Sequence, residues 1–185
     1  MTLRLSGGRK LQSPPGLTAR PTPARVRQAV MNMLAAQLPG CRWLDLCSGS
    51  GVMACEALRR GAARVVAVDH DRRNAAVART NLEGVAAAVA GASVQVRQGE
   101  VLRWLRAGRE ASGEEPFDLV YADPPYAAGL YEPLAAAILS GGWLQANGEL
   151  LLECASNNLP AVPQGWALID QRRYGTTTVL RLQQR

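Results

Sequence analysis

Two short segments of the chain carry residue types that could bind and activate a substrate. The first, Asp45-Leu-Cys-Ser-Gly-Ser-Gly51, is a glycine-rich turn that follows a short apolar run. In an open α/β sheet, nucleotide-like ligands bind at the turn between the first strand and its helix. The second, Asp123-Pro-Pro-Tyr126, follows another apolar run and ends in an aromatic ring. Both segments therefore predict ligand-binding turns at the ends of strands.

The spacing of the glycine turn is compatible with two cofactors. Gly49-x-Gly51-x-x-Ala54 fits the dinucleotide fingerprint, and Asp69 follows at the distance expected of a ribose-binding carboxylate. Asp45, however, would lie beside a bound pyrophosphate and repel it at short range. The same carboxylate attracts S-adenosylmethionine (SAM), which carries an ammonium and a sulfonium group. The turn therefore favours SAM, and an NAD-dependent oxidoreductase stays open as an alternative.

We expect SAM to contact residues at the ends of three successive strands. Asp69 would accept hydrogen bonds from both ribose hydroxyls. His70 would pack against the adenosine, with a bystander beside the site as the alternative. Glu100 would accept a hydrogen bond from the adenine amino group. The predicted cofactor-binding residues are Asp45, Ser48, Gly49, Ser50, Gly51, Asp69, His70, Glu100 and Val101.

The Asp-Pro-Pro-Tyr segment is suited to holding an exocyclic amine of a nucleobase. Its two prolines fix φ and remove two N–H donors, so the Asp123 carboxylate and the neighbouring carbonyls present only acceptors. Tyr126 would supply a face on which a displaced base stacks. A purely structural Pro-Pro turn with an Asx cap is the alternative. The predicted catalytic residues are Asp123, Pro124, Pro125 and Tyr126.

The elements that must position these segments alternate between strand and helix. Such alternation predicts an α/β fold with a parallel sheet covered by helices on both faces. The last two strands have no helix between them, which predicts an antiparallel hairpin at the end. The expected strands are residues 43–47, 64–68, 93–97, 117–121, 149–154, 167–170 and 177–182, and the expected helices between them are residues 52–60, 71–82, 101–107 and 130–139.

The net charge of +6 is concentrated at the beginning of the chain. The first 44 residues contain no acidic residue, and their basic residues are Arg4, Arg9, Lys10, Arg20, Arg25, Arg27 and Arg42. A GC-rich genome would explain the excess of arginine over lysine but not the missing acids. A basic segment on a nearly neutral body predicts an anionic partner, and arginine suits phosphate contacts. We expect Arg9, Lys10, Arg20 and Arg25 to bind RNA.

The basic segment contains two predicted elements. Residues 1–21 are short and broken by glycine and proline, which predicts a small hairpin or extended arm. We expect this arm to be mobile without RNA, because it has little core to bury, and to leave SAM binding unaffected. A helix should follow, with Thr22 as N-cap and Pro23 as its first residue. Arg25 and Arg27 lie away from the centre of its apolar stripe.

Composition and cysteine usage exclude several classes of protein. The chain has 185 residues, of which 48% are hydrophobic and 19% charged, as in a globular domain. No apolar run approaches the 18 residues of a membrane span, and the start lacks a secretory apolar region. Four cysteines without a CxxC pair and a single histidine exclude a common zinc site. We expect a cytoplasmic protein with reduced thiols and no metal.

Together these residues resemble a known family. Asp45 with Gly49-Ser-Gly51, Asp69 and Asp123-Pro-Pro-Tyr126 look like the class I SAM-dependent methyltransferases that modify base amino groups. The resemblance narrows to the RsmD-type 16S rRNA guanine-N2 methyltransferases and runs over nearly the whole chain. The segments that narrow it are Gly7-Gly-Arg-Lys-Leu11, Arg20-Pro-Thr22, Arg25-Val-Arg27, Glu56-Ala-Leu58, Gly61-Ala62 and Gly129-Leu-Tyr131. The sequence departs from the family at Met31, where an aromatic is usual, and at Ala54, near which a glycine is usual.

The resemblance implies a Rossmann-like class I methyltransferase fold in two parts. Residues 1–40 would form a basic RNA-binding arm and helix, and residues 41–185 would form the SAM-dependent domain. The activity implied is methyl transfer to the N2 amine of a guanine in 16S rRNA, within a small-subunit particle and by a monomer. The Asp-Pro-Pro-Tyr motif is shared with enzymes that methylate adenine N6 or cytosine N4, so these stay open. A non-catalytic RNA-binding module is a further alternative if no SAM binds.

Overall fold

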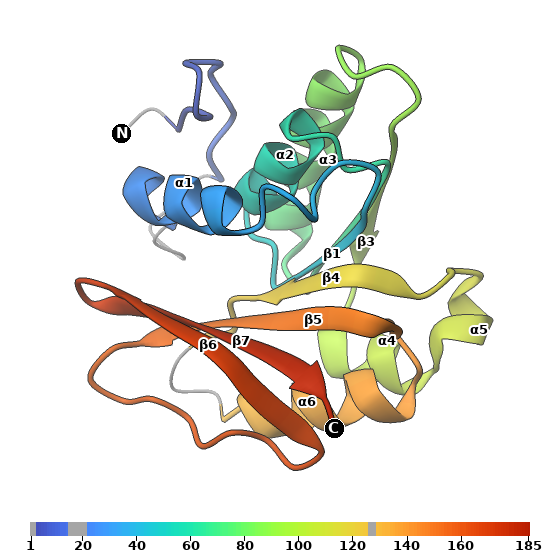
Figure 1. The fold of residues 1–185 in the computed structure, drawn as a ribbon. Coiled ribbons are helices and arrows are strands. Elements are labelled where there is room, and N and C mark those ends of the chain that lie inside the picture. Colours follow the sequence, from blue (N-terminus) through green and yellow to red (C-terminus); the bar gives the residue numbers. More distant parts are fainter. Residues whose placement is uncertain (1–2, 15–21, 126–128) are drawn as a thin grey trace. The chain divides into compact units, whose positions relative to one another are not determined.

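The computed structural model describes residues 3–14, 22–125 and 129–185, and the chain forms two compact units, Met1–Gly99 and Glu100–Arg185. In the first unit, β1 pairs parallel to β2, and β2 pairs parallel to β3. Both β1 and β2 are buried almost end to end, as expected of parallel strands covered by helices. The elements of this unit are α1 (Ala24–Met33), β1 (Arg42–Leu46), α2 (Val52–Arg59), β2 (Arg64–Asp69), α3 (Arg72–Ala86) and β3 (Ser93–Gln98) (Figure 1).

The second unit places a long strand at the centre of its pairing. Strand β5 pairs parallel to β4 on one side and antiparallel to β7 on the other, and β7 pairs antiparallel to β6. Trp143, Trp166 and Phe117 are fully buried and form its aromatic core. The elements are α4 (Val101–Arg106), α5 (Arg109–Ser112), β4 (Phe117–Ala122), α6 (Tyr131–Ser140), β5 (Leu144–Ala155), β6 (Trp166–Tyr174) and β7 (Thr177–Gln184).

The strand order is β3-β2-β1-β4-β5-β7-β6 in a seven-stranded sheet. The predicted α/β class, the mostly parallel sheet and the C-terminal antiparallel hairpin are therefore confirmed. Strand β6 is longer than the predicted residues 167–170, because most of it is exposed and polar and so lacks an apolar signal. Strand β5 likewise begins before residue 149, through the exposed residues 145–147. Helix α5 was not predicted from the sequence.

The start of α1 differs from the prediction. The helix begins at Ala24, its N-cap is Pro23, and no side chain caps it. Thr22 is buried, and its carbonyl accepts a hydrogen bond of 2.7 Å from Arg27. Arg27 is itself only 4% exposed, so its expected place at the margin of the buried face is wrong.

The N-terminal arm forms a small hairpin, as predicted. Arg4 and Lys10 form an antiparallel bridge, and the Leu5 amide donates to the Arg9 carbonyl at 2.9 Å. Leu3 and Leu5 are buried, with exposed fractions of 7% and 3%. The expectation that the arm has little to bury is therefore wrong for its described residues, 3–14.

Candidate cofactor and substrate sites

The turn after β1 is built from left-handed backbone. Cys47 has φ 60°, a conformation that residues other than glycine rarely adopt, and Gly49 and Gly51 have φ 54° and 72°. A Cβ at Gly51 would lie 3.1 Å from the Cβ of Ala78 on α3. At Gly49, by contrast, a Cβ would meet no atom of the described residues within 4 Å. Gly51 is thus required for packing, whereas Gly49 borders open space at the mouth of the turn.

Asp45 lies beneath this turn, on β1. It is 2% exposed, and its Oδ2 accepts a hydrogen bond of 3.1 Å from the amide of Ala54 in the first turn of α2. A carboxylate near the N-terminus of a helix is favoured by the helix dipole. Its negative charge also raises the pKa of the neighbouring Cys55 thiol, although burial is the larger cause. The structure therefore places a buried negative charge under the predicted cofactor turn.

Asp69 closes the turn from the end of β2. Its Oδ2 accepts the Gly49 amide at 2.7 Å, and its Oδ1 accepts the Asp71 amide at 2.9 Å and the Asn74 side-chain amide at 3.3 Å. The structure thus brings Asp69 and the glycine turn together. All three donors are uncharged, and a carboxylate has about four acceptor positions. Asp69 therefore has acceptor capacity left for a ribose hydroxyl.

The two serines of the turn, Ser48 and Ser50, differ in their hydrogen bonds. Ser50 uses its carbonyl, which accepts a hydrogen bond of 2.9 Å from Asn81 on α3. The Ser48 hydroxyl is buried, yet no hydrogen-bond partner for it exists among the residues that the structure describes. Buried polar groups without a partner are rare and call for an explanation. The orphaned hydroxyl, the open space at Gly49 and the nearby carboxylates fit a cationic nucleoside such as SAM.

The remaining predicted cofactor residues, His70, Glu100 and Val101, differ in how far they are buried. The His70 side chain is 74% exposed, with Nδ1 3.7 Å from Asp69 Oδ1. In the second unit, Glu100 caps α4, and its oxygens accept the amides of Leu102 and Arg103 at 2.9 and 2.6 Å. Val101 is 5% exposed. Glu100 therefore has a capping role that the sequence analysis did not assign.

The predicted catalytic segment begins directly after β4. Asp123 is half-buried, Pro124 is buried and Pro125 is exposed. Tyr126 lies outside the described residues. The pKa of Cys154 is raised to about 11, first by burial and then by the charges of Glu153 and Asp123. The Asp123 carboxylate therefore adds negative charge at the carboxyl end of β4, in keeping with its predicted role as an acceptor.

Glu153 was missed by the sequence analysis. It lies on β5, is 3% exposed, and accepts a hydrogen bond from the Tyr121 hydroxyl. The Tyr131 hydroxyl donates to the Glu153 carbonyl at 3.2 Å, which ties the start of α6 to the same strand. An acid inside the apolar run of residues 150–154 was the available signal.

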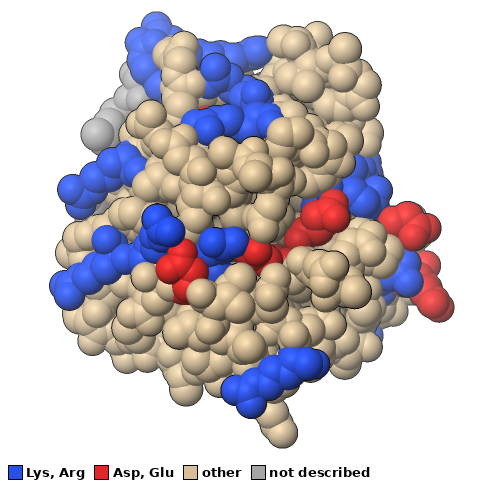
Figure 2. Space-filling model, viewed as in Figure 1, with Lys and Arg blue, Asp and Glu red and all other residues tan. Residues whose placement is uncertain are grey.

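The predicted RNA-binding residues that are described lie at the surface of the first unit. Lys10 and Arg25 are exposed, and Arg9 donates to the Gly84 carbonyl on α3 at 2.5 Å. Arg20 lies outside the described residues. Figure 2 shows basic side chains gathered over the arm and the adjoining helices. The structure thus brings Arg9 and Lys10 together on the hairpin, with Arg25 on α1.

Two polar residues to which the sequence analysis gave no role of their own anchor the arm. Glu56 on α2 is fully buried and accepts the amide of Ser6 at 2.7 Å, and the Arg27 Nε lies 3.7 Å from the same carboxylate. Asn81 on α3 accepts the Gln12 amide at 2.9 Å and donates to the Gln12 carbonyl at 3.0 Å. Since Asn81 also donates to Ser50, one side chain joins the arm to the cofactor turn.

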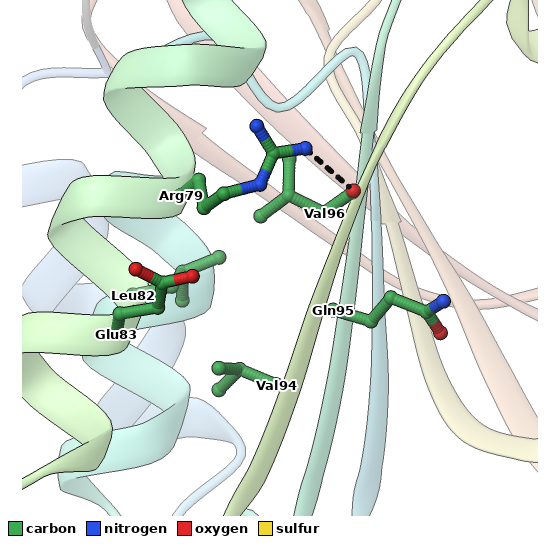
Figure 3. A pocket seen from close by; sticks show the side chains of 6 residues that line it. All are labelled: Arg79, Leu82, Glu83, Val94, Gln95 and Val96. Atoms are coloured by element: carbon green, nitrogen blue, oxygen red, sulfur yellow. Dashed lines mark hydrogen bonds between the residues drawn. The ribbon is translucent and has the colours of Figure 1, made fainter.

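A separate hollow lies between α3 and β3 (Figure 3). Its lining residues are Arg79, Leu82, Glu83, Val94, Gln95 and Val96, and Arg79 reaches across to donate to the Val96 carbonyl at 3.2 Å. None of the predicted cofactor residues belongs to this lining. Within residues 3–14, 22–125 and 129–185, no group of three or more His, Cys, Asp or Glu side chains could hold a metal ion.

No helix in the described part of the chain is long and apolar enough to cross a membrane.

Comparison with known proteins gives consistent matches. The family described as "Conserved hypothetical protein 95" matches residues 5–183. Ribosomal RNA small subunit methyltransferase D of Escherichia coli K12 is 33% identical over 179 residues, which cover 96% of this chain and 85% of the relative. Among solved structures, the Escherichia coli protein yhhF, described as a methyltransferase, has a TM-score of 0.82 at 30% identity and covers 100% of this chain and 99% of its own.

A more distant structure adds evidence about the fold. A protein described as a methyltransferase in complex with S-adenosylhomocysteine has a TM-score of 0.68 at 18% identity, covering 84% of this chain and 48% of its own. The predicted class I methyltransferase fold is therefore confirmed. The family match and the 33% identity over nearly the whole chain show that this protein belongs to the family of ribosomal RNA small subunit methyltransferase D.

Proposed function

We propose that this protein transfers a methyl group from SAM to the exocyclic N2 amine of a guanine in 16S rRNA. The observation that carries the proposal is the Asp123-Pro124-Pro125 segment at the carboxyl end of β4. Its half-buried carboxylate is followed by two residues that have no N–H to donate. Such a segment presents acceptors to an amine, and membership of the rRNA methyltransferase family supports RNA as the source of that amine.

The first unit would hold the cofactor. Asp45 and Asp69 supply negative charge around the glycine turn, Ser48 has an unused hydroxyl, and Gly49 leaves open space for the ligand. When bound, SAM supplies a methyl group on a positively charged sulfur. The relatives named as methyltransferases, and the S-adenosylhomocysteine bound to a protein of the same fold, support this choice over NAD.

The chain's own contribution to catalysis would be orientation. Asp123 would accept an N–H of the amine and thereby direct the nitrogen lone pair away from the carboxylate. Tyr126 would stack on the base after it has left its own stack. No side chain needs to remove a proton first, because the methylated amine is acidic once formed. Effective molarities for well-oriented reactants reach about 10⁵–10⁸ M, so orientation can supply most of the acceleration.

The RNA itself would be bound in part by the basic residues of the first 40 residues. Arg9, Lys10, Arg20 and Arg25 would contact phosphates, while residues 41–185 would carry the chemistry. An rRNA substrate in a small-subunit particle would place this activity in the cytoplasm. The relatives named for small-subunit rRNA support ribosomal RNA as the substrate. The choice of guanine N2 over adenine N6 or cytosine N4 rests on the resemblance to the RsmD-type enzymes.

The experiment is methylation of 16S rRNA and of small subunits purified from cells that lack the protein, with isotope-labelled SAM. Nucleoside digestion should yield N2-methylguanosine. N6-methyladenosine or N4-methylcytidine would replace the guanine assignment, and absence of labelled nucleoside from both substrates would overturn the proposal.

A variant tests the carboxylate directly. Asp123→Asn should lower kcat by about 10²-fold through misplacement of the amine, while the Kd for SAM changes less than about twofold. Asp118→Asn, on the same strand, is the matched control and should keep the parent kcat. If Asp123→Asn methylates at the parent rate, the Asp-Pro-Pro segment has only a structural role.

A further inference from the structure

The β6–β7 hairpin ends in a cluster that the proposed function does not use, comprising Arg172, Arg173 and Tyr174. The Arg172 side chain is 53% exposed, Arg173 is exposed, and Tyr174 is half-buried. Figure 2 shows basic side chains gathered over the left-hand end of this hairpin, with acidic side chains beside them. We call these three residues the hairpin tip.

Strand register places the hairpin tip at the same edge as the predicted catalytic segment of the second unit. Ala122, the last residue of β4, pairs with Leu152, which pairs with Leu180. One residue further along, Glu153 pairs with Val179, and Val179 pairs with Arg172. Asp123 continues β4 into this second row. Three strand spacings of about 4.8 Å separate the ends of the row, so Asp123 and Arg172 are about 14 Å apart.

Cross-strand partners project their side chains to the same face of a sheet. Glu153, Val179 and Arg172 therefore share one face. Arg173 pairs with Thr178 and projects to the other face, still at the same edge. The hairpin tip thus offers basic side chains on both sides of the strand, level with the carboxyl end of β4.

Two of the three arginines on β6 and β7 bind a carboxylate. Arg181 binds both oxygens of Glu149 at 2.8 Å, and Asp170 accepts from the Arg172 Nε at 2.9 Å. Arg173 instead donates from Nε to the Gly175 carbonyl at 3.1 Å, which leaves its charge uncompensated by that contact. These three arginines exceed the two acids that they bind, Asp170 and Glu149, by one positive charge. This excess lies beside the turn.

The hairpin tip is also held in place before any ligand arrives. The Ser156 amide, directly after β5, donates to the Thr176 carbonyl at 2.9 Å, and the Ser156 and Thr178 hydroxyls lie 2.8 Å apart. These contacts fix the turn to the end of the central strand. A rigid, preorganised group loses less entropy when it binds.

We propose that the hairpin tip binds backbone phosphates of the RNA strand that carries the target base, a few nucleotides from that base. At about 14 Å from Asp123, the tip is too far away to touch the base itself and is suited to the flanking backbone. Arginine forks match phosphate oxygens, and a neighbouring tyrosine ring can stack on an unpaired base. The inference rests on the proposed function, since it takes RNA as the substrate.

The test compares two double variants by titrating a fluorescent 16S rRNA transcript at several salt concentrations. Arg172→Ala/Arg173→Ala should flatten the log–log salt slope by about 1 to 2 units, since each neutralised phosphate contributes about 0.7–0.9. SAM affinity should stay at the parent value. Arg172→Lys/Arg173→Lys should retain most of the parent slope, because it keeps both charges.

The matched control is Arg106→Ala/Arg185→Ala, which removes the same charge from the same unit. Both residues are exposed and lie at the opposite edge. Arg185 follows β7 and donates its amide to Gly165, while the carbonyl of Leu105, next to Arg106, accepts from Trp143, just before β5 begins. The control should change the slope by less than half a unit. An equal loss in both double variants would overturn the inference.

Two further outcomes separate this inference from the proposed function. If Arg172→Ala/Arg173→Ala binds RNA with the parent affinity and salt slope, the proposed RNA binding by the hairpin tip is overturned, even if the parent methylates guanine. If the parent protein binds RNA but methylates no base, the proposed methyl transfer is overturned. RNA binding by the hairpin tip is then still decided by comparing the salt slopes of the variants. Arg173→Ala alone should lower the salt slope by about one unit. This substitution removes the hydrogen bond from the Arg173 Nε to the Gly175 carbonyl in the adjacent turn.

Discussion

The N-terminal arm and the C-terminal hairpin are both basic hairpins, but they are secured by different means. The arm has a single antiparallel bridge, Arg4 to Lys10, and is fixed to its unit by the polar side chains of Arg27, Glu56 and Asn81. The C-terminal hairpin pairs along most of β7 with both β5 and β6. Backbone ladders spread stability over many residues, whereas the arm depends on a few buried groups.

The difference has a consequence for function. One of the arm's anchors, Asn81, also holds the carbonyl of Ser50 in the cofactor turn. The C-terminal hairpin instead contacts Glu149 and Ser156, which belong to its own unit. Changes in the arm should therefore reach SAM binding, contrary to the expectation from sequence that the two are independent.

The largest effect is expected at the arm's buried ion pair. Arg27→Ala would leave Glu56, which is fully buried, without its cation, and removal of one partner of a buried pair costs about 3–5 kcal/mol. Urea unfolding should show that loss. Arg181→Ala in the C-terminal hairpin should cost less, because the Arg181 side chain is 16% exposed and the strand ladder remains.

The double variant Arg27→Met/Glu56→Leu is the control for this prediction. It removes both charges together and should recover much of the lost stability. A cost of less than about 1 kcal/mol for Arg27→Ala would show that the arm is not secured by this pair.

The next effect concerns the link between arm and cofactor. Asn81→Asp removes the N–H donor to Ser50 and Gln12 and sets a carboxylate against two carbonyls. A lost buried hydrogen bond costs about 1–2 kcal/mol, so SAM affinity should fall by about 5- to 30-fold. Calorimetric titration with SAM measures it, and limited proteolysis within residues 3–14 should become faster.

Thr80→Ala is the matched control, because Thr80 is the exposed neighbour of Asn81 on α3 and its hydroxyl donates to the Ala76 carbonyl of its own helix. It should leave both readouts unchanged. Arg172→Ala/Arg173→Ala should also leave SAM affinity unchanged. Parent SAM affinity in Asn81→Asp would show that the arm and the turn are independent.

The smallest effect is expected in the pKa values of two carboxylates, one from each unit. The Asn74 and Arg73 amides lower the pKa of Asp71, the N-cap of α3. For Asp170, burial opposes ionisation, but the hydrogen bond and charge of Arg172, the Gln171 amide and Arg181 together lower the pKa. Because both pKa values are below their unfolded values, each group stabilises the fold above about pH 4, and this contribution is lost as the pH falls through the folded pKa.

Salt should separate the two carboxylates. At about 1 M salt the screening length falls to about 3 Å, which weakens the charges that act on Asp170. The pKa of Asp170 should therefore rise toward its ordinary value in a carboxyl NMR titration. The pKa of Asp71 should change less, since backbone hydrogen bonds are its main cause. Equal salt responses would contradict this assignment of causes.

Much of the candidate site could be predicted because its residues are close in sequence. Asp45, Ser48, Gly49 and Gly51 belong to one turn, and apolar runs before them marked β1. Asp123 was found in the same way, from the strand that precedes it and the prolines that follow. The exposed polar end of β6, residues 171–174, and the capping role of Glu100 were not predicted, because neither has a hydrophobic pattern.

By itself, the sequence determined the order of strands and helices and the two chemical turns, since local patterns of apolar residues, glycine and proline decide these features. Only the tertiary structure decided which distant groups meet. Glu56 meets Ser6 across 50 residues, Asn81 meets Gln12 across 69, and β7 lies between β5 and β6. These contacts depend on the packing of helices and the register of strands. The coupling of the arm to the cofactor turn and the place of the hairpin tip therefore emerge only in the folded chain.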